Sequence, residues 1–562
     1  MKNKTFFKLF IILIIAFLFR VWMLDKPEGL WNDEYVSWYI ASRQSFTEFL
    51  ELVSKNCHTP LYYCFLKLWL MIFPDTDISL RISSVTASLL MIPALFSAGK
   101  EYKDNKTGLL CAFFAALSSF YIYFAQEARL YSLLGLVCAL LVLMCIKTLK
   151  YGRKRDFAVF ALLNAVLCAL HTLGLVFSFF IILFTLVYLY KHFDEWKQAA
   201  KNCRKTLVYI FPFICVLLLI SPFLFSILFS NSLSQFWSSF SYTKTAFSFI
   251  DYFSPMQLNI NNSPDTFRMY LFKNGSLNWN FVIFALFPSF IAFAALVKGF
   301  LLKDKILNVL IYSSGCFFTV LLVLSAIGKM VLLTKYSSEI YPVLILVFSA
   351  GILSIKNEFI KKAALVLYFA VSLVYLYFSP VSAPKLTRPE GNRAPVTLIE
   401  YSSLRKGDYI IFTYYDIDKF ERYMKNTKDY NIFSISKFNF NKPVFNSSNY
   451  FEVIHNGKSL YRDEFKKFPN PNVINYAEKM FINRMKKGDR IGIIYLEGVS
   501  FFSNETIQEI VNDDTRYRKT SFIFLAFSML RNSLMYAFKD DFKTRSITQA
   551  GSWTLIVYEK IR

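Results

Sequence analysis

Charged residues are scarce in this chain: they make up 18% of its 562 residues, whereas hydrophobic residues make up 55%. This composition excludes an ordinary soluble protein and is typical of a chain with several membrane-spanning helices. The nine cysteines lie mostly within apolar runs and never at CxxC spacing, which argues against a structural zinc site or a disulfide framework. The net charge of +24 comes without any nucleic-acid-binding motif, so we expect no nucleic-acid partner.

The N-terminus also lacks a cleavage site for a signal peptide. Residues 1–24 have a basic lead and a long apolar run with no small-residue cleavage site, so we expect a retained first helix. A helix needs about 20 apolar residues to cross about 30 Å of hydrocarbon. On this criterion the sequence predicts eleven spans, at residues 6–24, 78–98, 108–124, 130–148, 157–171, 173–190, 206–230, 279–297, 306–327, 339–355 and 362–379.

The apolar segment Thr59–Pro74 is short, and Lys67 interrupts it. If this segment were a span, the basic loops at 100–106 and 147–155 would lie outside, against the positive-inside rule. We therefore expect an interfacial helix there and a cytoplasmic N-terminus, in a multi-pass protein of the cytoplasmic membrane. The outer face then carries Asp25–Asp77, the turn Gln126–Arg129, the loop Asn231–Asn278, the turn Gly328–Ser338 and everything after Ser379.

After Pro380 the composition changes to a mixture of polar and apolar residues. The stretch "SPVSAPKLTRPEGNRAP" reads as a linker, and "GDYIIFTYY", "GDRIGIIYLEG" and "SWTLIVYEK" predict strands. Helix is expected within 464–487, and the apolar run at 522–538, which contains Arg531, predicts an amphipathic or core helix. The predicted fold is mainly α: a polytopic membrane bundle over residues 1–380, followed by an extracytoplasmic α/β domain over 381–562.

Four polar elements stand out at the predicted outer face. The first is the acidic pair Asp33 and Glu34, which follows the first helix and lies among Trp and Tyr residues. Acids close to a bilayer usually line a wet cavity or meet a cation, although a solvated pair or a helix N-cap is the alternative. The other three elements contribute His58 and Tyr62, then Glu127, Arg129 and Tyr131, and finally Lys335 and Tyr336.

Taken singly, these three elements have ordinary explanations: a capping histidine, a snorkelling arginine paired with Glu127, and a flanking lysine. Together they place acids and cations from separate segments on one face. That combination suits a reaction in which a carboxylate deprotonates an acceptor hydroxyl while Arg129 and Lys335 hold a lipid-borne phosphate. A departing phosphate gains charge in the transition state, and Arg or Lys stabilises it.

The order of these elements resembles the GT-C superfamily of membrane glycosyltransferases, in particular the bacterial relatives of dolichyl-phosphate-mannose protein mannosyltransferases and of lipid A aminoarabinose transferases. The matching stretches are "NDEYVSWYIA", "HTPLYYCFLKLWLMIF", "SLRISSVTASLLMIPALFSAGKEY", "YFAQEARLYSLLGL" and "KYSSEIYP". Relatives often have His-Pro-Pro where this chain has His58-Thr59-Pro60, and Arg-Tyr where it has Lys335-Tyr336. Lysine keeps the positive charge but loses the bidentate geometry of arginine.

The resemblance implies an inverting transfer of one sugar from a polyprenyl-phosphate donor to a lipid, glycan or protein acceptor on the outer face. By the same resemblance, Asp33 is the base and Glu34 shapes the acceptor site. Arg129, Lys335 and Tyr336 bind the donor phosphate, and the cavity is lined by His58, Tyr62, Glu127 and Tyr131. We expect no obligatory metal, although Asp33, Glu34 and His58 could approach a divalent ion in space.

Two other functions remain open on the sequence alone. A polytopic lipid or glycan transporter would use the same charges along a translocation path, but it predicts charged residues in mid-span and inverted repeats, of which the sequence offers little. A sensor would use its outer domain to bind a ligand, but eleven predicted spans are excessive for an anchor.

Overall fold

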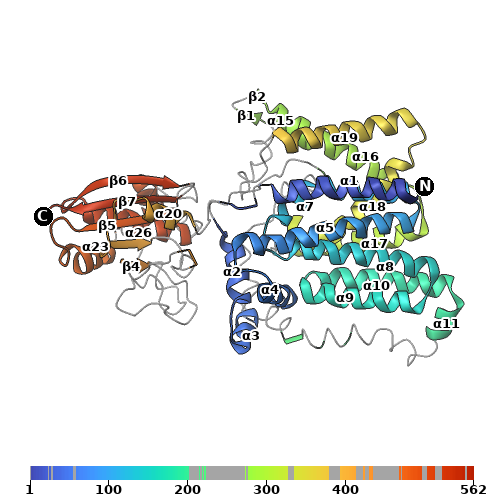
Figure 1. Cartoon of the computed structure of the whole chain (residues 1–562), viewed down its shortest axis with the longest axis horizontal. Coiled ribbons are helices and arrows are strands. Elements are labelled where there is room, and N and C mark those ends of the chain that lie inside the picture. Colours follow the sequence, from blue (N-terminus) through green and yellow to red (C-terminus); the bar gives the residue numbers. More distant parts are fainter. Residues whose placement is uncertain are drawn as a thin grey trace. The chain divides into compact units, whose positions relative to one another are not determined.

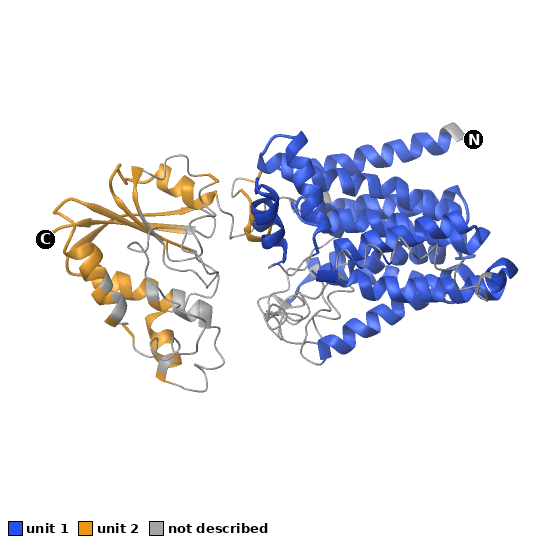
Figure 2. Cartoon of the chain, turned by 90° about the horizontal axis from the view of Figure 1, so that it is seen from below, with its two compact units in different colours: residues 1–24, 36–386 blue, residues 25–35, 387–562 orange. Residues whose placement is uncertain are grey.

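The chain forms two compact units (Figure 2). The first comprises residues 1–24 and 36–386, and the second comprises residues 25–35 and 387–562. The structure is a computed structural model, and it describes residues 2–22, 24–26, 29–54, 59–200, 214, 218, 221–222, 253, 272–273, 276–326, 334–378, 393–412, 422–423, 429–434, 468–469, 471–496, 503–512, 522–550 and 553–562.

The first unit is a bundle of long helices, with the short helices α2, α3 and α4 gathered at the end opposite the N-terminus (Figure 1). Its helices are α1 (Lys2–Val21), α2 (Asn32–Ala41, whose first four residues cluster with the second unit), α3 (Phe46–Ser54), α4 (Leu61–Ile72), α5 (Asp77–Tyr102), α6 (Asn105–Leu117), α7 (Ser119–Ala125), α8 (Tyr131–Tyr151), α9 (Lys154–Leu170), α10 (Gly174–His192), α11 (Asp194–Ala200), α15 (Trp279–Phe281), η2 (Val282–Leu286), α16 (Phe287–Phe300), α17 (Lys305–Ala326), η3 (Thr334–Ile340), α18 (Tyr341–Leu353) and α19 (Glu358–Phe378). Two short strands, β1 (Phe272–Lys273) and β2 (Ser276–Leu277), pair antiparallel.

Among the described residues, six helices are long and apolar enough to cross a membrane, and the bent pair α6–α7 would make a seventh. They cover Asp77–Tyr102, Tyr131–Tyr151, Gly174–His192, Val282–Phe300, Lys305–Ala326 and Thr334–Leu353. Helices also lie at the other predicted spans, except 206–230, of which only 214, 218, 221 and 222 are described. The protein is therefore a multi-pass membrane protein by length and composition, and the count of eleven spans stays a prediction.

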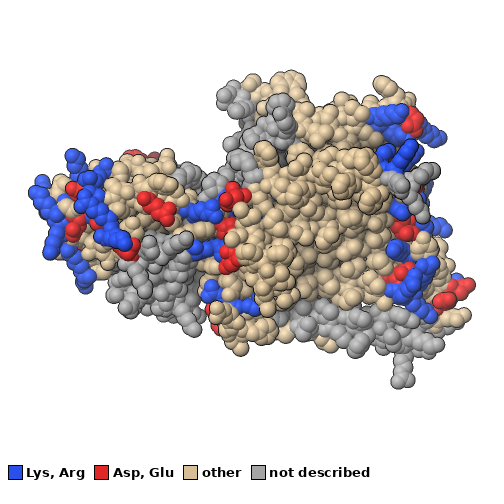
Figure 3. Space-filling model, in the orientation of Figure 1, with Lys and Arg blue, Asp and Glu red and all other residues tan. Residues whose placement is uncertain are grey.

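On the face that Figure 3 shows, charged side chains of the helical unit gather at its two ends, and a wide uncharged band lies between them. Such a band is the surface that lipid chains require. The helices of this unit expose large apolar side chains, such as Phe179 on α10 and Phe290 and Phe293 on α16. In a soluble protein these would be an aggregation hazard, whereas in hydrocarbon they cost nothing.

The span predicted at 108–124 is not one straight helix. Helices α6 and α7 meet at Ser118 with a bend of 57°. The fully buried Arg20, on α1, donates to the carbonyls of Ala115 and Ala116 at 3.0 Å each, just before the bend, and also to Ser88 Oγ at 2.8 Å. A bend leaves helical carbonyls without their intrahelical donors, and hydrocarbon supplies none, so Arg20 satisfies the backbone at this point.

Helix α4 fits the interfacial helix predicted for Thr59–Pro74. Its twelve residues span about 18 Å at 1.5 Å per residue, well short of the hydrocarbon thickness. Lys67, which interrupts the apolar run, donates to the backbone carbonyls of Ala41 and Arg43 at the end of α2. The lysine therefore caps a neighbouring helix instead of entering the lipid.

The second unit contains a five-stranded sheet in the order β4-β3-β5-β7-β6. Strand β3 pairs in parallel with β4 and β5, whereas β7 pairs antiparallel with β5 and β6. Its elements are α20 (Ala394–Glu400), β3 (Tyr409–Phe412), β4 (Asn431–Ser434), α23 (Pro471–Ala477), η7 (Glu478–Ile482), β5 (Arg490–Leu496), α24 (Asn504–Asn512), α26 (Phe522–Phe538), β6 (Phe542–Ala550) and β7 (Trp553–Lys560).

Strands β3, β5 and β7 confirm the three strands predicted from the sequence, and α26 lies at the predicted core helix. Strands β3 and β5 each follow a Lys-Gly-Asp turn in which the glycine, Gly407 or Gly488, has φ of +91°, a conformation that favours glycine. The core forms where Met529 and Phe538 of α26 cluster with Ile491 and Ile493 of β5 and with Ile556 of β7.

Candidate active site

The acidic pair begins helix α2. Asp33 is half-buried and Glu34 is fully buried, and both lie in the first turn of the helix. The backbone N–H of Trp31 donates to Glu34 Oε2 at 3.2 Å. Glu34 is the third residue of the helix and not its N-cap, and it reaches back to the backbone donor of Trp31, which precedes the helix, as the glutamate of a capping box does. The positive end of the helix dipole also favours carboxylates in this turn.

Within the first unit, the rest of α2 is held by side chains from three other segments. Ser37 accepts a hydrogen bond from Arg129 Nη1 at 3.1 Å. Trp38 Nε1 donates to both carboxylate oxygens of Asp75, at 3.0 and 2.9 Å, and Lys67 caps the end of the helix. Ser37 lies in the part of α2 that belongs to the first unit, so Arg129 is bonded to this part of the helix.

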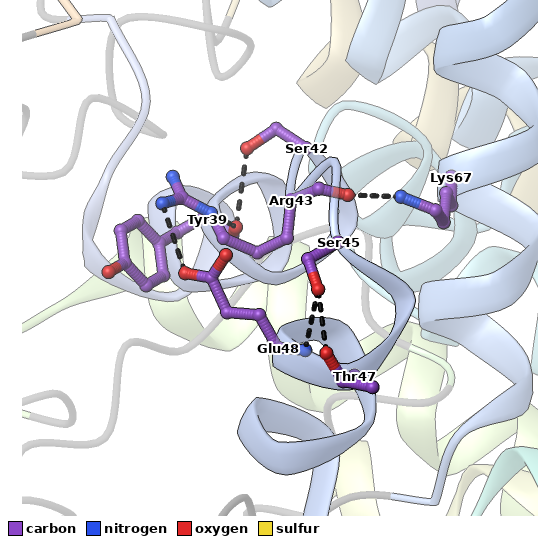
Figure 4. Close-up of polar contacts among 7 residues, drawn as sticks. All are labelled: Tyr39, Ser42, Arg43, Ser45, Thr47, Glu48 and Lys67. Carbon is purple, nitrogen blue, oxygen red and sulfur yellow. Dashed lines mark hydrogen bonds and ion pairs between the residues drawn. The ribbon is translucent and has the colours of Figure 1, made fainter.

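The turn from α2 into α3 is a compact polar cluster (Figure 4). The guanidinium of Arg43 lies 3.9 Å from the centre of the Tyr39 ring, and its Nη1 forms an ion pair of 3.5 Å with Glu48 on α3. Ser45 caps the start of α3 by accepting from the backbone N–H of Glu48 at 3.4 Å. Together with the bond from Lys67, these contacts fix the direction in which α2 runs.

The predicted second outer element is the tight turn between α7 and α8. Glu127 and Arg129 are buried in it, and Tyr131 starts α8 with its ring 4.5 Å from that of Phe124. The neighbouring Gln126 donates to the carbonyls of Phe19, Arg20 and Trp22 at 3.3, 3.3 and 3.0 Å, at the end of α1. The turn that carries Arg129 is therefore fixed to both α1 and α2.

The other predicted site residues belong to two further segments. Tyr62 is buried on α4, where its ring packs against Tyr63 at 5.9 Å, whereas His58 lies outside the described residues. Lys335 and Tyr336 are half-buried in η3, with the Lys335 ammonium 5.0 Å from the centre of the Tyr336 ring. A cation over an aromatic face is stabilised by the ring's quadrupole, so Tyr336 favours the charge of Lys335.

The structure adds a buried pair that the sequence analysis did not select. His171, in the turn between α9 and α10, lies with Nδ1 2.5 Å from Glu339 Oε1 on η3. Both side chains are buried, and among the described residues Oε2 of Glu339 has no hydrogen-bond partner. Glu339 is four residues after Lys335, so the pair ties η3, and the lysine on it, to the α9–α10 turn.

Because consecutive long helices alternate in direction, the α7–α8 turn, the α9–α10 turn and η3 share one end of the first unit, as do α3 and α4 (Figure 1). The segments at this end carry Arg129, Lys335, Tyr336 and Tyr62. Asp33 and Glu34 cluster with the second unit, so the chamber expected between Asp33 and the two cations stays a prediction. Within the described residues, no group of three or more His, Cys, Asp or Glu side chains is placed to hold a metal ion.

No protein-family model and no curated protein sequence matches the chain, whereas several solved structures are similar to it. ArnT from Cupriavidus metallidurans bound to undecaprenyl phosphate is 10% identical, with a TM-score of 0.51 over 99% of this chain and 98% of its own. The apo form of ArnT is 9% identical, with a TM-score of 0.54 over the same shares. A third solved structure is the archaeal oligosaccharyltransferase AglB from Archaeoglobus fulgidus, in complex with an inhibitory peptide and a dolichol-phosphate. It is 11% identical, with a TM-score of 0.44, and the match covers 88% of this chain and 69% of AglB.

The likeness to ArnT extends through both units, because it covers almost the whole of each chain. The resemblance to the GT-C superfamily expected from the sequence is therefore confirmed at the level of the fold. The chain has the GT-C fold.

Proposed function

We propose that the chain is a membrane glycosyltransferase that moves a single sugar, with inversion, from a polyprenyl-phosphate carrier to an acceptor hydroxyl or phosphate. The observation that carries the proposal is a fold shared over 99% of the chain with a protein that binds undecaprenyl phosphate. The reaction would take place on the outer face of the cytoplasmic membrane, with lipid, glycan or protein as the acceptor.

In this reaction Asp33 is the base. Its half-buried carboxylate would take the proton of the acceptor hydroxyl as that oxygen attacks the sugar C1, and the C1–phosphate bond would break with its electrons going to the phosphate oxygen. Glu34 would shape the acceptor site, since its carboxylate already bonds the backbone at the start of α2. Arg129 and Lys335 would stabilise the departing phosphate, with Tyr336 beside the lysine.

The direct test replaces Asp33 with asparagine, which keeps the shape and removes the base. Removing a general base typically costs about 10²- to 10⁴-fold in rate, so Asp33→Asn is expected to lower product by at least about a hundredfold. The measurement is mass analysis of envelope glycans in a deletion strain that expresses wild-type chain, Asp33→Asn, or no chain. The mass that returns only with wild type identifies the sugar.

The matched control is Glu51→Gln on α3, which removes an exposed acid from the same end of the helical unit. This variant is expected to restore the glycan fully. Normal product from a well-expressed Asp33→Asn chain would remove the proposed base. We further propose that no obligatory metal takes part, and we expect sugar transfer by the purified chain to persist in EDTA.

A further inference from the structure

The segment that leads into the acidic pair belongs to the C-terminal unit. Residues 25–35 make their contacts mainly with residues 387–562, although they lie between two helices of the membrane bundle in the sequence (Figure 2). The segment includes Asp33 and Glu34 and ends within the first turn of α2. Its Gly29 and Leu30 are buried, Leu30 completely.

Tyr423 of the C-terminal unit accepts a hydrogen bond from this segment. The backbone N–H of Leu30 donates to its phenolic oxygen at 2.7 Å. Leu30 lies three residues before Asp33, in the stretch that leads into α2. A bond from a side chain to a buried backbone N–H replaces water and fixes the chain at that point.

Arg393 holds the other end of the segment. Its Nη1 forms an ion pair of 3.5 Å with Asp25, and its guanidinium lies 5.4 Å from the centre of the Tyr423 ring. Arg393 directly precedes α20, and α20 packs against β6 and β7. The two residues that contact the acidic segment therefore contact each other, and Arg393 links them to the sheet.

Gly29 shows how closely these parts approach. It has φ of +74°, and a Cβ added there would lie 2.7 Å from the Tyr423 oxygen and 2.8 Å from Arg393 Cβ. Real Cβ atoms essentially never lie so close to other heavy atoms. A glycine is thus required both by the backbone conformation and by the space that Tyr423 and Arg393 leave.

We propose that Arg393 and Tyr423 are positioning residues, which form a clasp on residues 25–30 and thereby set the place of Asp33. The C-terminal unit then takes part in sugar transfer by fixing the acidic segment, without touching the reacting atoms itself. The structural half of this inference stands on the contacts alone. Its consequence for transfer rests on the proposed function.

The test of the clasp is hydrogen exchange, followed by mass spectrometry, of the full chain in lipid nanodiscs. Tyr423→Phe removes only the acceptor oxygen and keeps the ring. Peptides that contain Leu30 are expected to exchange about three- to tenfold faster in this variant, the ratio that corresponds to one lost hydrogen bond. The matched control is Tyr401→Phe, because Tyr401 is a strongly exposed tyrosine of the same unit. Unchanged exchange at Leu30 in Tyr423→Phe would overturn the clasp.

A second variant tests the close approach and does not depend on that hydrogen bond. Gly29→Ala adds a Cβ where Tyr423 and Arg393 leave no space, and it is expected to lower the melting temperature of the chain more than the control, Gly407→Ala. Gly407 also has a positive φ, but a Cβ added there meets nothing within 4 Å, so the difference between the two variants reports the crowding alone. An equal or smaller loss of stability in Gly29→Ala would contradict the close approach of the segment to Tyr423 and Arg393.

The link to transfer is read from envelope glycans, with expression and melting temperature measured in parallel. Tyr423→Phe is expected to lower product severalfold without a change in melting temperature, whereas Tyr401→Phe leaves it unchanged. Full product from Tyr423→Phe, despite faster exchange at Leu30, would overturn the positioning role. If instead Asp33→Asn retains full product while hydrogen exchange and the glycine variants behave as expected, the clasp stands and the proposed function fails.

Discussion

Arg129 and Glu339 are buried at one end of the helical unit, and each has a partner from a distant part of the chain. Arg129 donates to Ser37, 92 residues earlier, and Glu339 meets His171, 168 residues earlier. Polar side chains are expensive to bury near hydrocarbon unless they are hydrogen-bonded. These pairs therefore act as connections between segments, and they place the cations of the candidate site.

The His171–Glu339 pair is expected to show strong coupling. His171→Leu and Glu339→Met each leave one buried polar group without its bond, at a cost of about 1–3 kcal/mol in the free energy of unfolding. The double variant removes both polar groups, and replacing a buried pair by apolar residues is often nearly neutral. Thermal unfolding in detergent should therefore show the double variant more stable than either single one. Strictly additive losses would mean that the two side chains do not support each other.

For single residues, the sequence predicted those site residues that belong to a pattern near the ends of predicted spans, and it did not predict residues whose role depends on one distant contact. Arg129 and Lys335 were selected because a cation beside a span end, opposite an acidic loop, predicts a phosphate site. In the sequence, His171 was only the last residue of the span predicted at 157–171, and Glu339 only the first residue of the span predicted at 339–355. Each residue alone is ordinary, and only the fold brings them within 2.5 Å. A histidine and an acid that both lie at predicted span ends of the same face were the available signal.

Among the helices, the bend between α6 and α7 has the clearest physical cause. Ser118 lies at the bend, caps α7 through the backbone N–H of Tyr121, and meets Tyr341 at the start of α18 with 2.8 Å between the oxygens. Arg20 then bonds the carbonyls that precede the bend. Because α7 leads directly into the turn with Arg129, the bend sets the position of a predicted phosphate ligand.

Arg20→Met is expected to destabilise the protein strongly. Methionine keeps much of the side-chain length but leaves the carbonyls of Ala115 and Ala116 buried without donors. Loss of these bonds is expected to cost about 3 kcal/mol or more, since each unsatisfied buried group costs about 1–3 kcal/mol. Thermal unfolding in detergent measures the loss, and Arg20→Lys, which keeps the charge with fewer donors, should fall between wild type and Arg20→Met. Equal stability of all three chains would contradict the role given to Arg20.

The positions of the long helices could be predicted from apolar runs, because the bilayer requires each spanning helix to be apolar and about 20 residues long. The same rule does not predict the break at Ser118, since the run 108–124 carries no charged residue and the carbonyls before the break depend on a donor from α1. In the second unit, β3 and β5 were predicted from Gly-Asp turns followed by β-branched runs. Strand β6 was not, because its mostly polar sequence, "FKTRSITQA", has no apolar alternation that marks a buried face.

For the molecule as a whole, composition predicted a membrane part followed by a mixed domain, and it could not predict that residues 25–35 group with the latter. Such grouping depends on contacts between Leu30 and Tyr423, which are 393 residues apart. No periodicity in the sequence reports a contact of that kind. Gly29, beside this contact, is the feature of the local sequence that relates to it, and a single glycine before a helix is a weak signal.

The sidedness of the molecule yields the last prediction. The turns rich in Lys and Arg, at 100–106, 147–155, 298–305 and 356–362, join helix ends on the side where the N-terminus lies (Figures 1 and 3). The positive-inside rule makes that end cytoplasmic. Helix α19 runs from it to the opposite end, and α26 is in the core of the second unit and does not add a span. Alkaline phosphatase fused after Arg562 should therefore be active in a bacterial host, and green fluorescent protein fused there should stay dark while an N-terminal fusion fluoresces. A bright C-terminal fusion would place the acidic segment and its clasp in the cytoplasm, and this would contradict the proposed transfer on the outer face.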